Sequence, residues 1–201
     1  MPCYAFEGRI PVVHPTSFLH PLASLIGDVI VGPGCYIGPA ASLRGDFGRI
    51  LVTGDASVQD GCVLHGSAEQ DCVVGRGATI GHAAVLHGCV IGENVLVGIG
   101  ATVLDAAEIG DDCLVAAQTL VRGGQRFAPR GLIAGNPARL LRLLGAEEVT
   151  WRNDGDGEYQ RLARRSLAGL VPCAPLPEPE PDRKRNEGNA RPVRLGRGRK
   201  D

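Results

Sequence analysis

Three of the five histidines lie close together in the chain, and two of them occur in the same tetrapeptide, Val-Leu-His-Gly, at residues 63–66 and 85–88. Imidazole nitrogens are common zinc ligands, and a site with three of them keeps a fourth position open for water, as in catalytic zinc sites. We therefore predict that His65, His82 and His87 bind Zn²⁺, or Co²⁺, Fe²⁺ or Ni²⁺, which accept the same ligands. The other two histidines each precede a proline, and we expect them to be ordinary surface residues.

An aliphatic side chain recurs every six residues through most of the chain, with three shifts in register. A six-residue period fits neither a 3.6-residue helix nor an alternating strand, whereas three short strands in each triangular coil of about eighteen residues produce it directly. The pattern predicts an all-β fold, a left-handed parallel β-helix over residues 1–135, and it disfavours an irregular β-sandwich. The repeating positions are Leu19, Leu25, Val31, Ile37, Leu43, Val52, Val58, Leu64, Val74, Ile80, Leu86, Ile91, Val97, Val103, Ile109, Val115 and Val121.

This repeat determines where the histidines lie. His65 and His87 each follow an inward aliphatic residue and are 22 residues apart, which is one coil plus a four-residue insertion, so we expect them on adjacent coils about 5 Å apart. His82 precedes His87 by roughly 16 Å of extended backbone, too far to share an ion within one chain. We therefore predict a homotrimer in which His82 of one subunit faces the other two histidines of the next. The insertion at residues 67–71 predicts a mobile loop beside His65.

The sequence after the repeat predicts two helices and a tail. Asn136 and Pro137 suit a helix N-cap and first turn, so a helix is predicted to begin there. A second helix is predicted from an apolar face formed by Tyr159, Leu162, Ala163, Leu167 and Leu170. Residues 136–171 are thus predicted to be C-terminal helices packed on the prism, and residues 172–201, rich in proline and arginine, a flexible tail.

Composition and charge indicate a cytoplasmic protein without a nucleic-acid or membrane partner. The net charge of −1 provides no long-range field for either. Seven cysteines without a Cys-X-X-Cys pair are typical of free thiols in a reducing compartment. The N-terminal residues lack the apolar run of a signal peptide, and no later stretch is long enough to span a membrane.

Three segments around the histidines resemble the signature of the γ-class carbonic anhydrases and their hexapeptide-repeat relatives. They are Leu-Arg-Gly-Asp-Phe-Gly-Arg-Ile at 43–50, Val-Gln-Asp-Gly-Cys-Val-Leu-His-Gly at 58–66 and Ile-Gly-His-Ala-Ala-Val-Leu-His-Gly at 80–88. The resemblance implies a metal bound by the three histidines across a trimer interface. It also implies a position for Gln59 beside the metal-bound water, and intersubunit salt bridges from Arg44, Asp46 and Asp60.

The ends of the chain, at residues 4–21, 158–167 and 175–185, resemble one subgroup of this family, the phenylacetate-degradation (PaaY) and carnitine-operon (CaiE) proteins. This resemblance implies a metal-dependent enzyme that works beside coenzyme A thioester pathways. It also implies that Tyr159 reaches toward the site, although a tyrosine on the apolar face of a helix equally suits a structural role.

A metal held by three neutral imidazoles lowers the pKa of its bound water toward 7 and provides hydroxide at neutral pH. Our first hypothesis is that this hydroxide hydrolyses small acyl-CoA thioesters, with Gln59 orienting water or substrate. Glu69 is a candidate proton carrier, although a solvated surface carboxylate is its simpler interpretation. The second hypothesis is hydration of carbon dioxide to bicarbonate, which Phe47 disfavours because the archetypal anhydrase has glutamate there. A hexapeptide acyltransferase with one histidine as general base and a noncatalytic assembly protein remain open.

Overall fold

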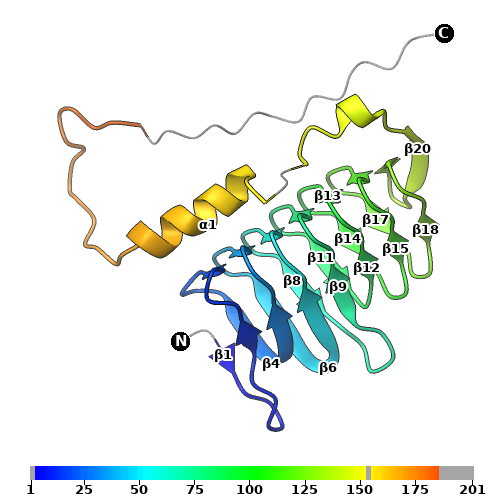
Figure 1. Ribbon diagram of the computed structural model, residues 1–201, viewed down its shortest axis with the longest axis horizontal. Coiled ribbons are helices and arrows are strands. Elements are labelled where there is room, and N and C mark those ends of the chain that lie inside the picture. The colour runs from blue at the N-terminus through cyan, green and yellow to red at the C-terminus, as the bar shows by residue number, and fades with distance from the viewer. Residues whose placement is uncertain (1–2, 153–154, 186–201) are drawn as a thin grey trace.

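The computed structural model describes residues 3–152 and 155–185, and its main body is a prism of stacked β-strands (Figure 1). Two sheets, of twelve and eight strands, form the walls of the prism. The named strands pair in parallel throughout, except that β19 (Gly131–Ala134) and β20 (Arg139–Leu143) are antiparallel. The predicted parallel β-solenoid is therefore confirmed.

The twelve-stranded sheet forms two of the three walls, because β4 (Ser24–Val31) and β6 (Ser42–Val52) run through the corner between them. The first wall also contains β1 (Cys3–Tyr4), β8 (Val63–His65), β11 (Val85–His87), β14 (Thr102–Val103) and β17 (Leu120–Val121). The second wall also contains β2 (Val12–Val13), β9 (Cys72–Val74), β12 (Val90–Ile91), β15 (Glu108–Ile109) and β18 (Arg126–Phe127).

The eight-stranded sheet is the third wall, and its register measures the length of each coil. Phe18 pairs with Tyr36 eighteen residues later, and Leu96 pairs with Leu114 after another interval of eighteen. The interval lengthens where the sequence carries its insertions: Ser57 pairs with Thr79, 22 residues later. Besides β19 and β20, this wall contains β3 (Phe18–Leu19), β5 (Tyr36–Ile37), β7 (Ser57–Val58), β10 (Thr79–Ile80), β13 (Leu96–Val97) and β16 (Leu114–Val115).

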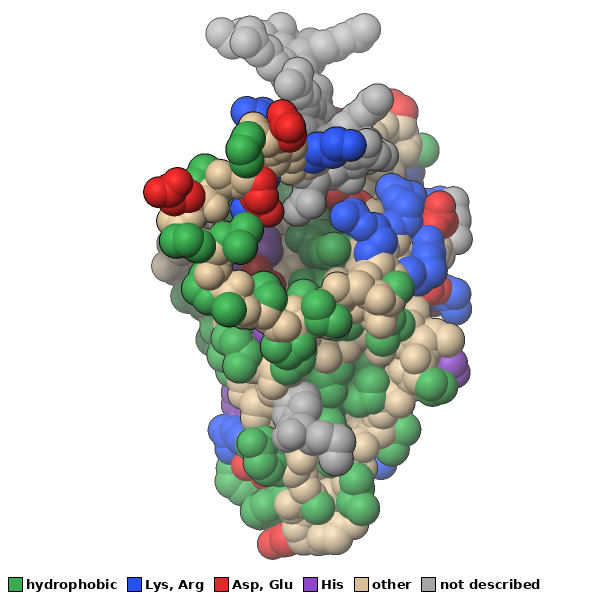
Figure 2. Space-filling model, turned by 90° about the vertical axis from the view of Figure 1, so that its left-hand side faces the viewer, with side chains coloured by type: hydrophobic (Ala, Val, Ile, Leu, Met, Phe, Trp, Pro, Cys, Tyr) green, Lys and Arg blue, Asp and Glu red, His purple; other side chains and the backbone are tan. Residues whose placement is uncertain are grey.

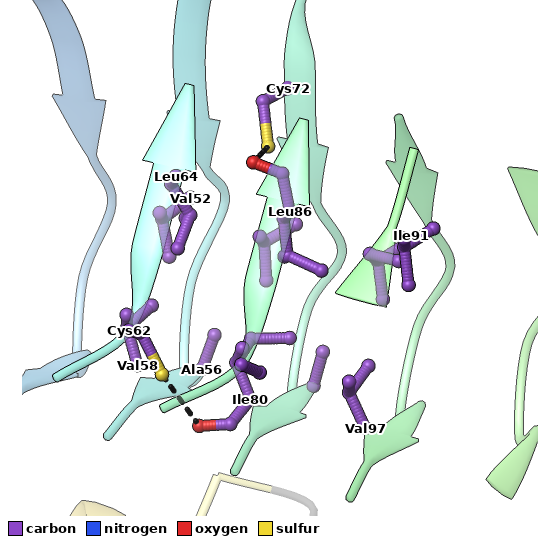
Figure 3. Close-up of a cluster of buried hydrophobic side chains, with 14 of the residues drawn as sticks. Val52, Ala56, Val58, Cys62, Leu64, Cys72, Ile80, Leu86, Ile91 and Val97 are labelled. Atoms are coloured by element: carbon purple, nitrogen blue, oxygen red, sulfur yellow. Dashed lines mark hydrogen bonds between the residues drawn. The ribbon is translucent and has the colours of Figure 1, made fainter. Parts of the chain in front are cut away.

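The repeating aliphatic residues fill the inside of the prism (Figure 3). Sixteen of the seventeen predicted inward positions are buried, and the exception, Leu19, is partly buried at the open first coil. Small residues lie two positions before most of them, as Ala56 does before Val58, because the corners of a narrow prism leave little room. Stacking each coil on the next therefore buries a continuous apolar core.

Five of the seven cysteines occupy these small inward positions, and all seven are free thiols. Burial raises the pKa of Cys35 and of Cys62 to about 11, so these thiols hold their protons at neutral pH. Cys173 is exposed and Cys3 is partly exposed. We therefore expect an aromatic disulfide reagent at about pH 8 to label Cys173 quickly, Cys3 slowly, and the other five only after unfolding in guanidinium. Rapid labelling of three or more thiols in the folded protein would contradict this packing.

The insertions in the repeat lie together at the corner between the first and second walls. Residues 67–70 form a tight turn there, closed by reciprocal backbone hydrogen bonds of 2.9 and 3.2 Å between Ser67 and Gln70. The turn lies directly against Gly48, where an added Cβ would come within 2.4 Å of the Ser67 carbonyl oxygen. The segment expected to be a mobile loop beside His65 is thus a closed turn packed on the preceding coil.

The prediction of a helix beginning at Asn136 was wrong. The Ala138 N–H donates to the Leu120 carbonyl at 2.8 Å, and the side chain of Gln125 donates to the Ala138 carbonyl. The backbone here therefore continues the hydrogen bonding of the last coil, and the chain turns back as β20 instead of starting a helix. Tertiary hydrogen bonding outweighs the local signal of a cap and a proline.

The second predicted helix is confirmed as α1 (Glu158–Gly169), and a short 3-10 helix, η1 (Ala146–Glu148), precedes it. After η1 the chain lies against the prism, where the Trp151 indole donates to the Asn94 carbonyl at 2.6 Å. Helix α1 then packs on β3 and β5 at the opposite end (Figure 1). Only the start of its apolar face is covered, because Ala163 is buried whereas Leu167 is 51% exposed.

Beyond α1, residues 172–185 form no helix or strand and are exposed, whereas 186–201 of the predicted tail lie outside the described residues. None of the helices in the described ranges has the length and apolar character needed to cross a membrane.

Candidate metal centre

Two of the predicted ligands stack on adjacent coils, as the repeat predicts. In the first wall, β6, β8 and β11 place Arg44, His65 and His87 in register, one above the other. The imidazole centroids of His65 and His87 are 4.9 Å apart, close to the spacing of neighbouring strands. Both side chains leave the wall at the corner that carries the insertions.

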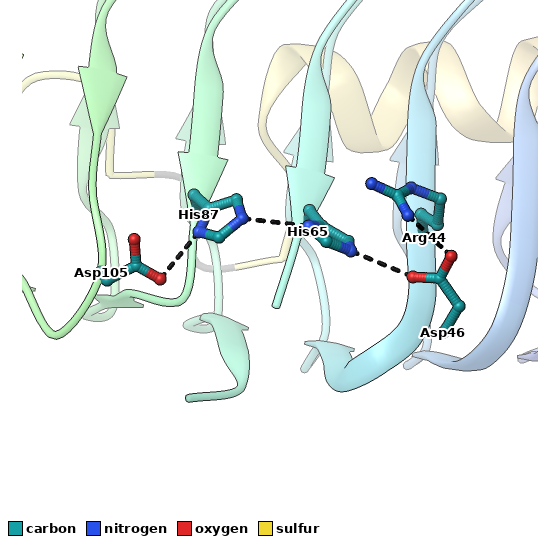
Figure 4. Close-up of polar contacts among 5 residues, drawn as sticks. All are labelled: Arg44, Asp46, His65, His87 and Asp105. Carbon is teal, nitrogen blue, oxygen red and sulfur yellow. Dashed lines mark hydrogen bonds and ion pairs between the residues drawn. The ribbon is translucent and has the colours of Figure 1, made fainter. Parts of the chain in front are cut away.

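The two imidazoles belong to a continuous chain of polar contacts along this corner (Figure 4). His87 Nδ1 lies 2.7 Å from a carboxylate oxygen of Asp105, and His87 Nε2 lies 3.0 Å from His65 Nδ1. His65 Nε2 lies 3.0 Å from Asp46, whose other oxygen accepts a 2.7 Å hydrogen bond from Arg44. A carboxylate thus terminates the histidine pair at each end.

The two carboxylates favour one arrangement of the protons on the histidine pair. Burial raises the pKa of Asp46, but hydrogen bonds from Arg44 and His65 outweigh it and hold the pKa below its usual value, so Asp46 is ionised at neutral pH. A neutral imidazole has one N–H, and if each N–H is directed at its aspartate, the two facing nitrogens, His65 Nδ1 and His87 Nε2, both carry lone pairs. In that arrangement the facing nitrogens suit a shared cation, because they are 3.0 Å apart and two imidazole ligands of tetrahedral zinc lie about 3.3 Å apart.

His82 lies at a different corner of the same chain, between the third and first walls. Its Nδ1 is 3.1 Å from Asp60, one coil away, and both side chains are close to half exposed. Each of the three predicted ligands thus has its own aspartate, which is the usual outer partner of a histidine that binds a metal. Within the described part of one chain, no three His, Cys, Asp or Glu side chains converge as a metal site.

The other residues implied by the resemblance divide between these two corners. Gln59 is buried and immediately precedes Asp60, so it lies at the His82 corner. Arg44 and Asp46 pair with each other within the chain, as does Asp60 with His82. Glu69 is exposed in the turn at 67–70, and its carboxylate contacts neither histidine of the pair.

Tyr159 lies in an aromatic cluster between α1 and the third wall. Its ring centroid is 5.5 Å from that of Tyr36, which in turn stacks on Phe18 at 5.4 Å. Burial, together with the negative charge of Asp60, raises the pKa of Tyr159 to about 12, so the phenol is neutral at neutral pH. The ring is thus packed between α1 and the third wall.

We expect Tyr159→Ala to lower the free energy of unfolding by about 2 kcal/mol, because it removes a half-buried ring from this cluster. Tyr159→Phe keeps the ring and is expected to change stability by less than about 0.5 kcal/mol. Denaturant unfolding of both variants at one protein concentration measures the difference. A Tyr159→Phe variant that is stable but inactive would instead assign the hydroxyl a role at the site.

Two residues next to the histidine pair were not among the predicted site residues: Asp105 was missed, and Phe47 was noted only as a departure from the archetypal anhydrase. Leu86 pairs with Val103, seventeen residues later, so Asp105 lies one position past the residue level with His87, and the repeat did not mark it. Phe47 lies at the other end, with its ring centroid 5.7 Å from that of His65 and 71% of its surface exposed. Its ring adds exposed apolar surface beside the candidate metal position.

Comparison with known proteins places this fold in one class. The family described as bacterial transferase hexapeptide (six repeats) matches residues 88–123. A putative acetyltransferase from Bacillus cereus is 30% identical with a TM-score of 0.80, covering 83% of this chain and 96% of that one. A hexapeptide transferase family protein from Anaplasma phagocytophilum is 34% identical with a TM-score of 0.76, covering 81% and 96%.

A more similar relative identifies the family within this class. The carnitine operon protein CaiE of Escherichia coli (strain K12) is 50% identical over 188 residues, which cover 94% of this chain and 96% of that protein. CaiE of Proteus sp. (strain LE138) is 47% identical over the same length. The chain therefore belongs to the hexapeptide-repeat proteins, in the family of CaiE.

Proposed function

We propose that this protein is a homotrimeric, metal-dependent hydrolase of small acyl-CoA thioesters, with zinc or a similar divalent ion held by His65 and His87 of one subunit and His82 of the next. The proposal is supported by the facing pair of imidazole nitrogens, 3.0 Å apart, with an aspartate at the other nitrogen of each ring. Acyl-CoA is proposed as substrate because the Bacillus cereus relative is described as a putative acetyltransferase. Trimers with closed symmetry provide the shared site.

The proposed roles of the residues of this chain are the following. His65 and His87 are held in place by Asp46 and Asp105, and His82 by Asp60. The exposed ring of Phe47 would pack against the acyl group. When bound, the metal would activate water and polarise the thioester carbonyl. Hydrolysis forms a bond from the water oxygen to the carbonyl carbon and breaks the carbon–sulfur bond, giving a carboxylic acid and the coenzyme A thiol.

A second candidate is a metal-independent acyltransferase, which the 2.7 Å contact between His87 and Asp105 favours. A histidine backed by a carboxylate is the arrangement of a general base, and it would take a proton from an acceptor amine or alcohol as that acceptor attacks the thioester. The solved relatives described as transferases point the same way. This candidate requires neither a metal nor His82.

The experiment combines elemental analysis of the purified protein with an assay of thiol release from a panel of acyl-CoA esters. We expect about one zinc-type ion per chain, hydrolysis without any acceptor, loss of activity with a chelator and recovery on adding Zn²⁺ or Co²⁺. Activity that survives chelation and requires an amine or alcohol would favour the acyltransferase. Metal-dependent hydration of carbon dioxide without thioester hydrolysis would favour a carbonic anhydrase, and an intact metal site without turnover would favour an assembly protein.

A further inference from the structure

We propose that Asp105 is a positioning residue of the metal centre: its carboxylate keeps the single proton of His87 on Nδ1, so that Nε2 stays free to bind the metal. The inference rests on the proposed function, and it concerns a residue that the sequence pattern around the histidines did not suggest. The inference is based on the 2.7 Å distance between His87 Nδ1 and an Asp105 oxygen, a length typical of a hydrogen bond to an ionised carboxylate (Figure 4).

The backbone holds Asp105 in the next coil, beside Gly88, the residue that follows His87. The next residue, Ala106, donates its N–H to the carbonyl of Gly88 in the coil on one side at 2.7 Å. The carbonyl of Asp105 itself accepts from the N–H of Gly124, in the coil on the other side, at 2.8 Å. Asp105 is therefore fixed between two coils, and its short side chain has little freedom to move away from the imidazole.

Gly88 leaves the space that the carboxylate occupies. A Cβ added to Gly88 would lie 2.6 Å from the Asp105 oxygen that contacts His87, and 3.0 Å from the Cβ of Gln70. Gly88 also adopts a φ of +52°, a conformation that glycine tolerates better than other residues. The glycine of the second Val-Leu-His-Gly segment is thus explained by the close approach of Asp105 to His87.

Asp105 differs from the aspartate at the other end of the pair. Asp46 shares its charge between His65 and Arg44. Among the described residues, the carboxylate of Asp105 has an ion-pair contact with His87 alone. Its effect is therefore concentrated on the tautomer of one ring. Without it nothing holds the proton on Nδ1, and the Nε2–H tautomer, which cannot bind a metal through that nitrogen, becomes populated.

The test compares Asp105→Ala and Asp105→Asn in the full-length protein. Glu108→Gln is the matched control, because Glu108 is a similarly exposed carboxylate, 48% against 49%, that pairs with Arg126 on the second wall. The first readout is the tautomer of His87 in metal-free protein, from long-range ¹H–¹⁵N spectra of histidine-labelled samples, assigned with His87→Ala. The second is the dissociation constant for Zn²⁺, measured by competition with a chelator.

We expect the wild-type protein and Glu108→Gln to show the Nδ1–H tautomer of His87, and Asp105→Ala to show the Nε2–H tautomer. Asp105→Ala should weaken Zn²⁺ binding about 10- to 100-fold, and Asp105→Asn, whose amide oxygen can still accept the hydrogen bond, should weaken it less. An unchanged tautomer and a zinc dissociation constant within about twofold in Asp105→Ala would overturn the inference. A wild-type protein that binds no zinc would overturn the proposed function, and the metal-free spectra would then still decide whether Asp105 holds the tautomer.

Discussion

Replacement of His82 by alanine is expected to remove both the metal and acyl-CoA hydrolysis while leaving the folded solenoid intact. His82 is 42% exposed at a corner, and its partner in the same chain is Asp60, so its loss leaves no cavity in the core. A metal that loses one of three imidazoles loses more affinity than the roughly 100-fold attributed to the loss of an outer partner. Elemental analysis measures the metal content, the thiol-release assay measures hydrolysis, and denaturant unfolding measures the stability of the solenoid.

His14→Ala is the control for this experiment, because His14 is an exposed histidine whose hydrogen-bond partner is the neighbouring Thr16. It should retain the wild-type metal content and rate. Full metal content and full activity in His82→Ala would show that the site lies within one chain or does not involve this histidine. Activity without metal would favour the acyltransferase.

Truncation of Leu64 to alanine is expected to lower the free energy of unfolding by about 2 to 5 kcal/mol. Leu64 is fully buried and pairs with Leu43 on one side and Leu86 on the other. A solenoid core is narrow and each coil packs only on its neighbours, so the cavity cannot be filled by distant side chains. Because His65 follows directly, the substitution should also weaken zinc binding.

Leu176→Ala makes the same chemical change at a residue that is 59% exposed and lies outside any helix or strand. Its effect should remain within about 0.5 kcal/mol. Both variants should be unfolded at the same protein concentration, because subunit association adds to the apparent stability. A loss of less than about 1 kcal/mol in Leu64→Ala would mean that this position does not belong to a close-packed core.

The fold was predictable from the sequence because one physical requirement repeats in it. Each coil must place an aliphatic residue inside each wall, and the inward series from Leu25 to Val121 follows that rule. At the end of the solenoid the chain has no repeating pattern of this kind. Asn136 and Pro137 have the local character of a helix start, but the preceding coil offers open hydrogen-bonding groups, and the chain pairs with them before turning into β20. Local propensity cannot reveal that competition.

The same contrast holds for the site. The stacking of His65 on His87 follows from coil length plus one insertion, and the structure has them in register. Whether an aspartate reaches a histidine nitrogen depends on the direction of its short side chain at a corner. The six-residue period does not indicate that direction. Asp105 was therefore missed. Asp46, expected at a subunit contact from the resemblance alone, hydrogen-bonds His65 within the chain.

The most direct test of the shared metal site is complementation between two inactive variants. His65→Ala and His82→Ala each destroy every site in a homotrimer, but a mixed trimer contains one junction that joins an intact His82 to an intact His65 and His87. Refolding the two chains together at equal amounts should restore about a quarter of the wild-type zinc content and thioester hydrolysis. The failure of mixed trimers, verified by mass spectrometry, to recover either metal or activity would contradict a site built between subunits.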